Sequence, residues 1–424
     1  MKIVFIEPRS KETNVYSKLY MPLLGPVYLA TILKKYGHKV EVINENIYQP
    51  DYKDIKADII CISILTPTAN RGYEIAKKFP KDKVIMGGVH ASLLPEEALN
   101  FSRQVVVGEA EGVIVDLVEG RLKDEIIYTK PIENLDKIPF ADFSLIKGYN
   151  PKNRIIPVLT SRGCPFNCSF CSVTKLFGHK YRFRSPENVI KELKGLPSNN
   201  LFFCDDNFSA SIPRAKDLLS KLIKEKYYFT TQLRCDTTLD LNLLSKAGCR
   251  NVCIGFESIN SKTLEEYNKN QTIDDIISAI ENFHKNKIRI HGMFVLGSDL
   301  DTKETILNTA SFAIKNKIDT IQLMILTPFP GTKVYNIFKN ENRIFTLDWN
   351  LYDGQHVVFK PKLLSPKELQ IFVLKSYFKF YSVLNSFSLL LKLNLRNAFF
   401  RFMGYKILKE WNAKNYRLDW LNNI

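Results

Sequence analysis

Three of the eight cysteines in this chain lie within eight residues, as Cys164, Cys168 and Cys171 in the segment TSRGCPFNCSFCSV. The other five are scattered, mostly through apolar strand-like runs, which is typical of reduced and buried thiols. Thiolates gathered on one loop favour a metal ion or a cluster over a packing role. Two kinds of site fit these residues: a zinc ion completed by His179, or an iron–sulfur cluster.

The spacing favours the cluster. Structural zinc loops usually bring their ligands as two pairs, and no second pair exists here. A zinc site in so basic a chain would indicate a nucleic-acid-binding protein, but no nucleic-acid motif accompanies the charge. A four-iron cubane normally takes four thiolates. Three would leave one iron open for a substrate that binds through amino and carboxylate groups, as a catalytic metal keeps one free position.

The elements around this loop predict a partial TIM-type (β/α)6 barrel over residues 151–345. Apolar strands alternate there with helical stretches, in too few repeats for an eight-unit barrel. The ligands of such barrels bind at the C-terminal strand ends, where the cysteine loop and the segments CDDNF and GFES fall. The expected strands cover residues 154–161, 200–208, 229–236, 251–258, 288–297 and 320–331.

Residues 1–130 predict a separate doubly wound domain, followed by a linker over 131–150. Continuous apolar strands separated by helices are typical of a parallel sheet that is covered on both faces. The ligand of such a sheet lies at the C-terminal strand ends, where glycines let a backbone approach it closely. These ends are Ser63 to Asn70, Gly87 to Ser92 and Gly108 to Gly112, although each turn alone could simply start a helix.

The C-x3-C-x2-C motif after the first strand of a partial barrel resembles that of the radical S-adenosylmethionine superfamily. The resemblance implies that the open iron of a 4Fe–4S cluster chelates S-adenosylmethionine, and that one electron from the cluster breaks a carbon–sulfur bond. The resulting 5′-deoxyadenosyl radical then abstracts a hydrogen atom from the substrate. An electron donor such as flavodoxin or ferredoxin is implied as well.

The same resemblance assigns S-adenosylmethionine to residues near the barrel strand ends. They are Phe170 for adenine, Asp205, Asp206 and Asn207 for the methionine amine, Arg234 for the carboxylate, Glu257 for the ribose hydroxyls, and Gly292 and Gly297 for backbone contact with adenine and ribose. Each type of residue also has a structural explanation. The aspartates could cap a helix, the arginine could form an ion pair, the glutamate could lie beside a helix N-cap, and the glycines could serve turns.

The N-terminal domain resembles the cobalamin-binding domain that precedes many radical S-adenosylmethionine barrels. The resemblance rests on PLLGPVYLATILKKYGHKVEVIN and on strand ends that would contact the corrinoid, at Ser63, Leu65, Thr66, Gly87, Gly88, Gly108 and Glu109. The motif Asp-x-His-x-x-Gly, whose histidine ligates cobalt in many such domains, is absent. His38 lies in a turn, and His90 either touches a ligand tail or starts a helix. Cobalamin would therefore bind without a protein imidazole, or the domain keeps the fold alone.

If cobalamin binds, the resemblance implies methylation of an unactivated carbon. If it does not bind, the resemblance implies cyclisation, rearrangement or carbon–carbon coupling.

Residues 346–424 predict a helical, basic and aromatic region with a capping box at Ser365 and Glu368. This region either caps the barrel or forms an amphipathic surface for an anionic bilayer or a lipid-like substrate. Relatives with similar tails act on polycyclic, apolar molecules.

The composition bounds the remaining possibilities. The formal net charge is +16, and residues 366–424 carry ten Lys or Arg against three Asp or Glu. The first ten residues lack the long apolar core of a secretory signal, and no apolar run is long enough to cross a membrane. We therefore expect a cytoplasmic enzyme, with possible peripheral membrane contact, that acts on a small, apolar molecule and not on nucleic acid.

Overall fold

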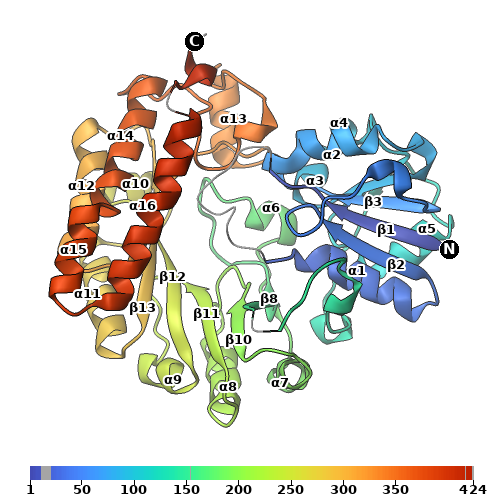
Figure 1. Ribbon diagram of the computed structural model, residues 1–424, viewed down its shortest axis with the longest axis horizontal. Helices are drawn as coiled ribbons and strands as arrows, with labels where there is room; N and C mark the ends of the chain where they lie inside the picture. Colours follow the sequence, from blue (N-terminus) through green and yellow to red (C-terminus); the bar gives the residue numbers. More distant parts are fainter. Residues whose placement is uncertain (11–20, 153, 416, 423–424) are drawn as a thin grey trace.

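The computed structural model describes residues 1–10, 21–152, 154–415 and 417–422, which form an α/β fold with two parallel sheets. Figure 1 shows the first sheet in blue on one side and the second in green and yellow on the other. The C-terminal helices, in red, cover the side of the second sheet that faces away from the first. This arrangement confirms the predicted fold class.

The first sheet, sheet A, is parallel throughout, with the order β2-β1-β3-β4-β5-β6. This is the doubly wound order in which strand order reverses beside β1, so that a ligand site forms at the C-terminal edge. The strands β1 to β5 are the continuous apolar runs from which the sequence predicts this domain, whereas β6 has only three residues and was not predicted. The strands are β1 (Lys2–Glu7), β2 (Lys39–Asn44), β3 (Ile59–Ser63), β4 (Val84–Gly87), β5 (Gln104–Val107) and β6 (Ile126–Tyr128).

Helices cover both faces of sheet A, because its central strands are apolar on both sides. Ile3 and Phe5 of β1 pack with α1 and α5, whereas Val4 and Ile6 face α2, α3 and α4. The helices are α1 (Leu24–Lys35), α2 (Ala69–Ala76), α3 (Val89–Leu93), α4 (Pro95–Leu99) and α5 (Ile114–Val118).

The second sheet, sheet B, is an open half-barrel of six parallel strands in the order β14-β13-β12-β11-β10-β7. We call the C-terminal strand ends of sheet B the barrel mouth. A short antiparallel pair, β8 (Ser161–Arg162) with β9 (Arg182–Phe183), follows β7 and was not predicted. The strands are β7 (Ile156–Val158), β10 (Asn200–Phe203), β11 (Tyr228–Leu233), β12 (Cys249–Glu257), β13 (Arg289–Leu296) and β14 (Thr320–Ile325).

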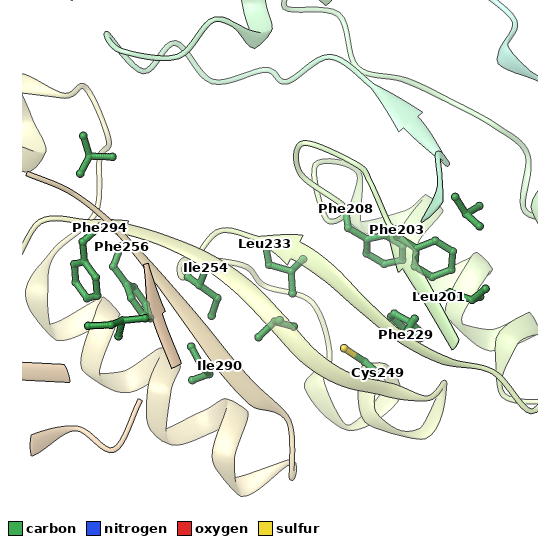
Figure 2. Packing of buried hydrophobic residues seen from close by; sticks show 14 of the residues in the cluster. Leu201, Phe203, Phe208, Phe229, Leu233, Cys249, Ile254, Phe256, Ile290 and Phe294 are labelled. Atoms are coloured by element: carbon green, nitrogen blue, oxygen red, sulfur yellow. The ribbon is translucent and has the colours of Figure 1, made fainter. Parts of the chain in front are cut away.

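The outer face of sheet B carries the main core of the barrel. Figure 2 shows Phe203, Phe229, Ile254 and Ile290 from successive strands pointing to the same side of the sheet, with Phe256 and Phe294 farther along β12 and β13. Alternate residues of each strand are buried in this core, as the two-residue period of a strand requires. The helices against it are α7 (Pro186–Lys194), α8 (Ile212–Leu222), α9 (Leu241–Lys246), α10 (Ser261–Glu266), α11 (Ile273–Lys285) and α12 (Lys303–Lys315).

The C-terminal region covers the edge strand β14. Helix α14 (Pro366–Phe380) begins at the predicted capping box and packs on α12. Near its end, the Tyr377 hydroxyl accepts the Leu323 N–H at 2.7 Å, and the Tyr381 hydroxyl accepts the Ile321 N–H at 2.9 Å and donates to the Ile321 carbonyl at 2.7 Å. These bonds satisfy backbone groups that an edge strand otherwise leaves open.

Three further helices complete the region after sheet B, α13 (Lys333–Asn340), α15 (Val383–Leu391) and α16 (Leu395–Asn415). Between α13 and α14, Trp349 donates its indole N–H to Glu97 of sheet A's domain at 2.8 Å, so this segment touches both sheets' domains. In the part of the chain that the structure describes, no helix is long and apolar enough to span a bilayer.

Candidate active site

The cysteine loop runs from β8 to α6 (Val173–Phe177) and is held at both ends. Gly163, with φ +85°, begins it; a Cβ there would lie 2.5 Å from the Lys180 carbonyl oxygen, so only glycine fits the turn. Near the other end, the Cys171 N–H donates to the Cys168 carbonyl at 3.2 Å. These contacts fix the path of the loop at both ends.

The three thiols of this loop are half-buried, and Cys168 lies close enough to the other two to raise the pKa of each. Burial is the main cause and raises the pKa of Cys171 to about 12. Such thiols stay protonated until a metal displaces the protons. Among the described residues, no three His, Cys, Asp or Glu side chains are grouped as ligands of one metal ion, and His179 is exposed. The preference for a cluster over zinc therefore rests on the cysteine spacing in the sequence.

Asp205, predicted for the methionine amine, uses its carboxylate within the protein. It accepts the backbone N–H of Thr160 at 2.7 Å and of Ser161 at 2.9 Å, as well as the Thr160 hydroxyl. The side chain is fully buried. Asp205 therefore fixes the chain that leads into the cysteine loop.

Asp206 differs from its neighbour. It lies near Cys164 and Cys171, and burial, followed by the charge of Asp205, raises its pKa to about 6. A cation beside this carboxylate would be strongly stabilised. Asn207, by contrast, is buried, and its side-chain oxygen accepts from the Ser209 N–H at 3.3 Å and the Ser209 hydroxyl at 3.2 Å.

Arg234 lies at the end of β11 and stacks over Phe166 of the cysteine loop at 3.9 Å. Its guanidinium forms a bidentate pair with Asp236, at 2.9 and 2.8 Å, and donates to the Lys269 carbonyl at 2.6 Å. The ion pair foreseen as the structural alternative is thus present, beside the loop.

Glu257 ends β12 in the left-handed region, with φ +63°, where the register with β13 shifts. A non-glycine residue in that region costs free energy, and such residues concentrate at functional sites. Its carboxylate pairs with Lys269 at 2.7 Å, and both side chains are buried. Both charges act on Cys168, so this pair lies at the barrel mouth near the cysteine loop.

The remaining residues predicted for S-adenosylmethionine pack within the protein. Phe170 meets Tyr267 edge to face at 5.1 Å. Gly292 faces the ring of Phe256, and Gly297, at the end of β13, lies against Leu369 of the C-terminal region.

The residues predicted for cobalamin gather at the C-terminal edge of sheet A. Gly88, with φ +92°, lies so close to the loop after β3 that a Cβ would come within 2.7 Å of the Ile64 carbonyl oxygen, whereas Gly87 has room for one. Ser63 and Leu65 are half-exposed, while Thr66 is buried with its hydroxyl 3.4 Å from His90. The Gly108 N–H donates to Ser92 at 3.1 Å.

Glu109, also predicted for cobalamin, joins the two domains through buried ion pairs. Its carboxylate forms ion pairs with the guanidinium groups of Arg162, at 2.8 Å, and Arg182, at 2.5 Å, and all three side chains are buried. Glu111 takes a second nitrogen of Arg162 at 2.5 Å. Burial alone would raise the pKa of Glu109, but the two arginines outweigh it and hold the pKa below its usual value. Since Arg162 stands two residues before Cys164, this ion cluster ties the cysteine loop to sheet A.

Sequence reasoning missed several residues of this site. Lys269, Arg162 and Arg182 are ordinary cations in the sequence, and their partners lie 12, 53 and 73 residues away. The one available signal was the run of alternating arginines in YRFRS, which follows the cysteine loop.

Comparisons with known proteins define the class of this site. The family model described as the Radical SAM superfamily matches residues 158–313, and that of the B12 binding domain matches residues 13–118. The chain belongs to the radical S-adenosylmethionine superfamily and carries a B12-binding domain before its barrel.

Individual relatives are similar over most of their length. The bacteriochlorophyllide d C-8(2)-methyltransferase of Chlorobaculum tepidum is 32% identical, over 81% of this chain and 82% of the relative. The anaerobic magnesium-protoporphyrin IX monomethyl ester cyclase of Cereibacter sphaeroides is 27% identical, over 90% and 70%. The structure of the radical S-adenosylmethionine methyltransferase TsrM from Kitasatospora setae, with cobalamin and a 4Fe–4S cluster bound, is 16% identical, with a TM-score of 0.65 over 88% and 81%. This last similarity concerns the fold alone.

Proposed function

We propose that this enzyme methylates an unactivated carbon of an apolar, polycyclic small molecule. One observation carries the proposal: the C-terminal edge of sheet A faces the cysteine loop. Helix α3, which follows Gly88, contacts α6, which follows the cysteines, and Glu109 bonds Arg162. A cofactor at that edge and another on that loop would meet over the same substrate.

Cys164, Cys168 and Cys171 would hold a 4Fe–4S cluster, and Ser63, Leu65, Gly87 and Gly88 would line the corrinoid site. When bound, the cluster supplies the electron that cleaves S-adenosylmethionine, and cobalamin supplies the methyl group. The chain's own residues orient these groups. The carboxylate of Asp206 would accept a hydrogen bond from the methionine amine, and that of Glu257 would accept hydrogen bonds from the ribose hydroxyls. The buried Asp205 would hold the cysteine loop in place.

The substrate class follows from the relatives. A bacteriochlorophyllide and a protoporphyrin ester are the molecules in their names, and both are large, polycyclic and apolar. Reduction by a flavodoxin or a ferredoxin stays a prediction.

The ligand assignment is tested by Cys168→Ala after anaerobic reconstitution. We expect the variant to lose cleavage of S-adenosylmethionine to 5′-deoxyadenosine and methionine, together with most of its iron and sulfide. Cys61→Ala is the matched control, because Cys61 lies in the core of sheet A, and it should keep both. Cleavage at the wild-type rate in Cys168→Ala would refute the assignment.

Cyclisation or coupling is the second candidate, because a relative of 27% identity is named a cyclase. The two reactions differ in their products. Methyl transfer forms S-adenosylhomocysteine, one for each methyl group added, in enzyme that contains a corrinoid. Formation of 5′-deoxyadenosine without S-adenosylhomocysteine, in enzyme fully loaded with corrinoid and substrate, would favour the second candidate.

A further inference from the structure

The hairpin formed by α15 and the start of α16, residues 383–403, carries the largest group of exposed large hydrophobic side chains in the described chain. Of the 22 large hydrophobic side chains that are exposed, 11 lie in these 21 residues. Leu384, Leu391 and Leu393 are the most exposed, at 81%, 72% and 85%. Single exposed leucines are ordinary, but a contiguous group of this size marks a surface that meets another phase or molecule.

The hairpin is built with its apolar side outward. The side chains that α15 and the first two turns of α16 bury are Ser386, Ala398 and Arg401. Asn397 and Arg401 bond Asp319 and the Ile318 carbonyl beside β14, at 2.7 and 3.2 Å, and so attach the hairpin to the barrel. Small and polar groups therefore make the internal contacts, and leucine and phenylalanine are left for solvent.

Leu393, in the turn between the two helices, is the most exposed of these leucines. It follows α15 in the left-handed conformation, with φ +57°, where glycine or asparagine is favoured. Leu418 has a similar φ of +53° but is only 5% exposed, so packing compensates its strain. At Leu393 the turn is closed by backbone bonds, from the Leu393 N–H to the Leu390 carbonyl and from the Asn394 N–H to the Leu389 carbonyl, both at 2.9 Å, but the side chain is left 85% exposed. A partner surface would remove this apolar side chain from water.

The charge around the hairpin identifies the partner. From residue 369 to 409 the chain has seven Lys or Arg and no Asp or Glu. Lys392 and Arg396 flank the turn and are exposed. Two-fold association through this surface would bring like charges face to face, which is unfavourable. Exposed leucines and phenylalanines with cations among them fit the interface of an anionic bilayer.

The surface lies at the end of the barrel opposite its mouth. Helix α14 starts near the mouth, where Leu369 meets Gly297 after β13, and ends where Tyr381 bonds Ile321 at the start of β14. Figure 1 shows α15 at the far end of α14, away from the blue N-terminal domain. The hairpin is therefore no part of the proposed active site.

We propose that the α15–α16 hairpin docks the enzyme on anionic lipid bilayers, with its leucines in the interfacial region and Lys392 and Arg396 at the headgroups. This attachment leaves the barrel mouth pointing away from the docked end. The proposal is independent of the reaction that the active site performs.

Vesicle flotation of the anaerobically reconstituted enzyme tests the proposal. We expect binding to vesicles of equal parts phosphatidylcholine and phosphatidylglycerol, weakened about tenfold or more by pure phosphatidylcholine or high salt. K392Q/R396Q should weaken binding to the anionic vesicles about tenfold or more, since each cation near the surface contributes to attraction. L384S/L391S/L393S should weaken binding by at least as much.

The control variant I155S/L347S/L363S replaces three exposed apolar residues elsewhere and should bind like the wild type. All variants should cleave S-adenosylmethionine at the wild-type rate, which shows that they fold and separates this test from that of the reaction. Absence of vesicle binding by the wild type, or binding that L384S/L391S/L393S leaves unchanged, would overturn the proposal. So would a wild-type dimer that this variant converts to a monomer, because the surface would then belong to a second copy.

Discussion

The barrel mouth and the C-terminal edge of sheet A, the two proposed ligand sites of this enzyme, differ in the kinds of residue that form them. The mouth gathers charged side chains, including Asp206, Arg234 and the Glu257–Lys269 pair. The turns after β3, β4 and β5, at the edge of sheet A, offer glycines and small residues, and Glu109, which follows β5, bonds the barrel. Charged side chains suit a small zwitterion such as S-adenosylmethionine, whereas a bare backbone suits close approach by a large macrocycle. This difference supports the proposed placement of S-adenosylmethionine at the barrel mouth and of the corrinoid at the edge of sheet A.

Breaking the connection between the two edges should have the largest effect on stability. Glu109→Ala leaves Arg182 buried without its carboxylate, and loss of one partner of a buried ion pair costs about 3–5 kcal/mol. We expect a loss of that order in urea unfolding, together with slower S-adenosylmethionine cleavage. Glu133→Ala is the control, because its pair with Lys180 is exposed. A Glu109→Ala variant as stable as the control would show that the domains are held by apolar packing.

A second prediction concerns Glu7, at the end of β1 on the edge of sheet A. Burial raises its pKa from 4.5 to about 7. Because the folded state prefers the protonated form, the ionised carboxylate destabilises it, with no cost below about pH 4.5 and the full cost above about pH 7. At 1.4 kcal/mol per pKa unit, this cost approaches about 3 kcal/mol.

Glu7→Gln should therefore flatten the fall in unfolding free energy between about pH 5 and pH 8 and stabilise the chain at the upper end. Urea unfolding of the wild type and variant at both pH values measures the difference. Equal pH dependence of the two would mean that Glu7 is solvated in the folded state.

The smallest effect sharpens the contrast within one turn of sheet A. Gly88→Ala places a Cβ against the Ile64 backbone at positive φ, which should cost about 2 kcal/mol. Gly87→Ala has room and should cost less than about 1 kcal/mol. Thermal unfolding and corrinoid retention report the two effects. If Gly87→Ala alone lost the corrinoid, Gly87 would contact the ligand and Gly88 would serve only the turn.

The sequence was sufficient to predict most of the strands of both sheets, because they are continuous apolar runs. It was also sufficient for the family, because the cysteine spacing is specific. The short strands β6, β8 and β9 were not predicted, because two or three residues are too few to show the alternation of buried and exposed side chains that marks a strand.

The division of labour between Asp205 and Asp206 escaped as well. Adjacent identical residues differ here because one meets the backbone of Thr160, 45 residues away, and the other does not. For the same reason, the sequence did not predict the bonds from Arg162 and Arg182 to Glu109, which join residues 53 and 73 positions apart.

An open, partial barrel has two edge strands, and an edge strand can pair with a strand of another molecule. At β14 a side chain blocks such pairing, because the hydroxyl of Tyr381 bonds both the N–H and the carbonyl of Ile321. A phenol thus stands where a seventh strand would otherwise pair. The barrel can therefore remain open without leaving β14 available for aggregation through its sheet edge.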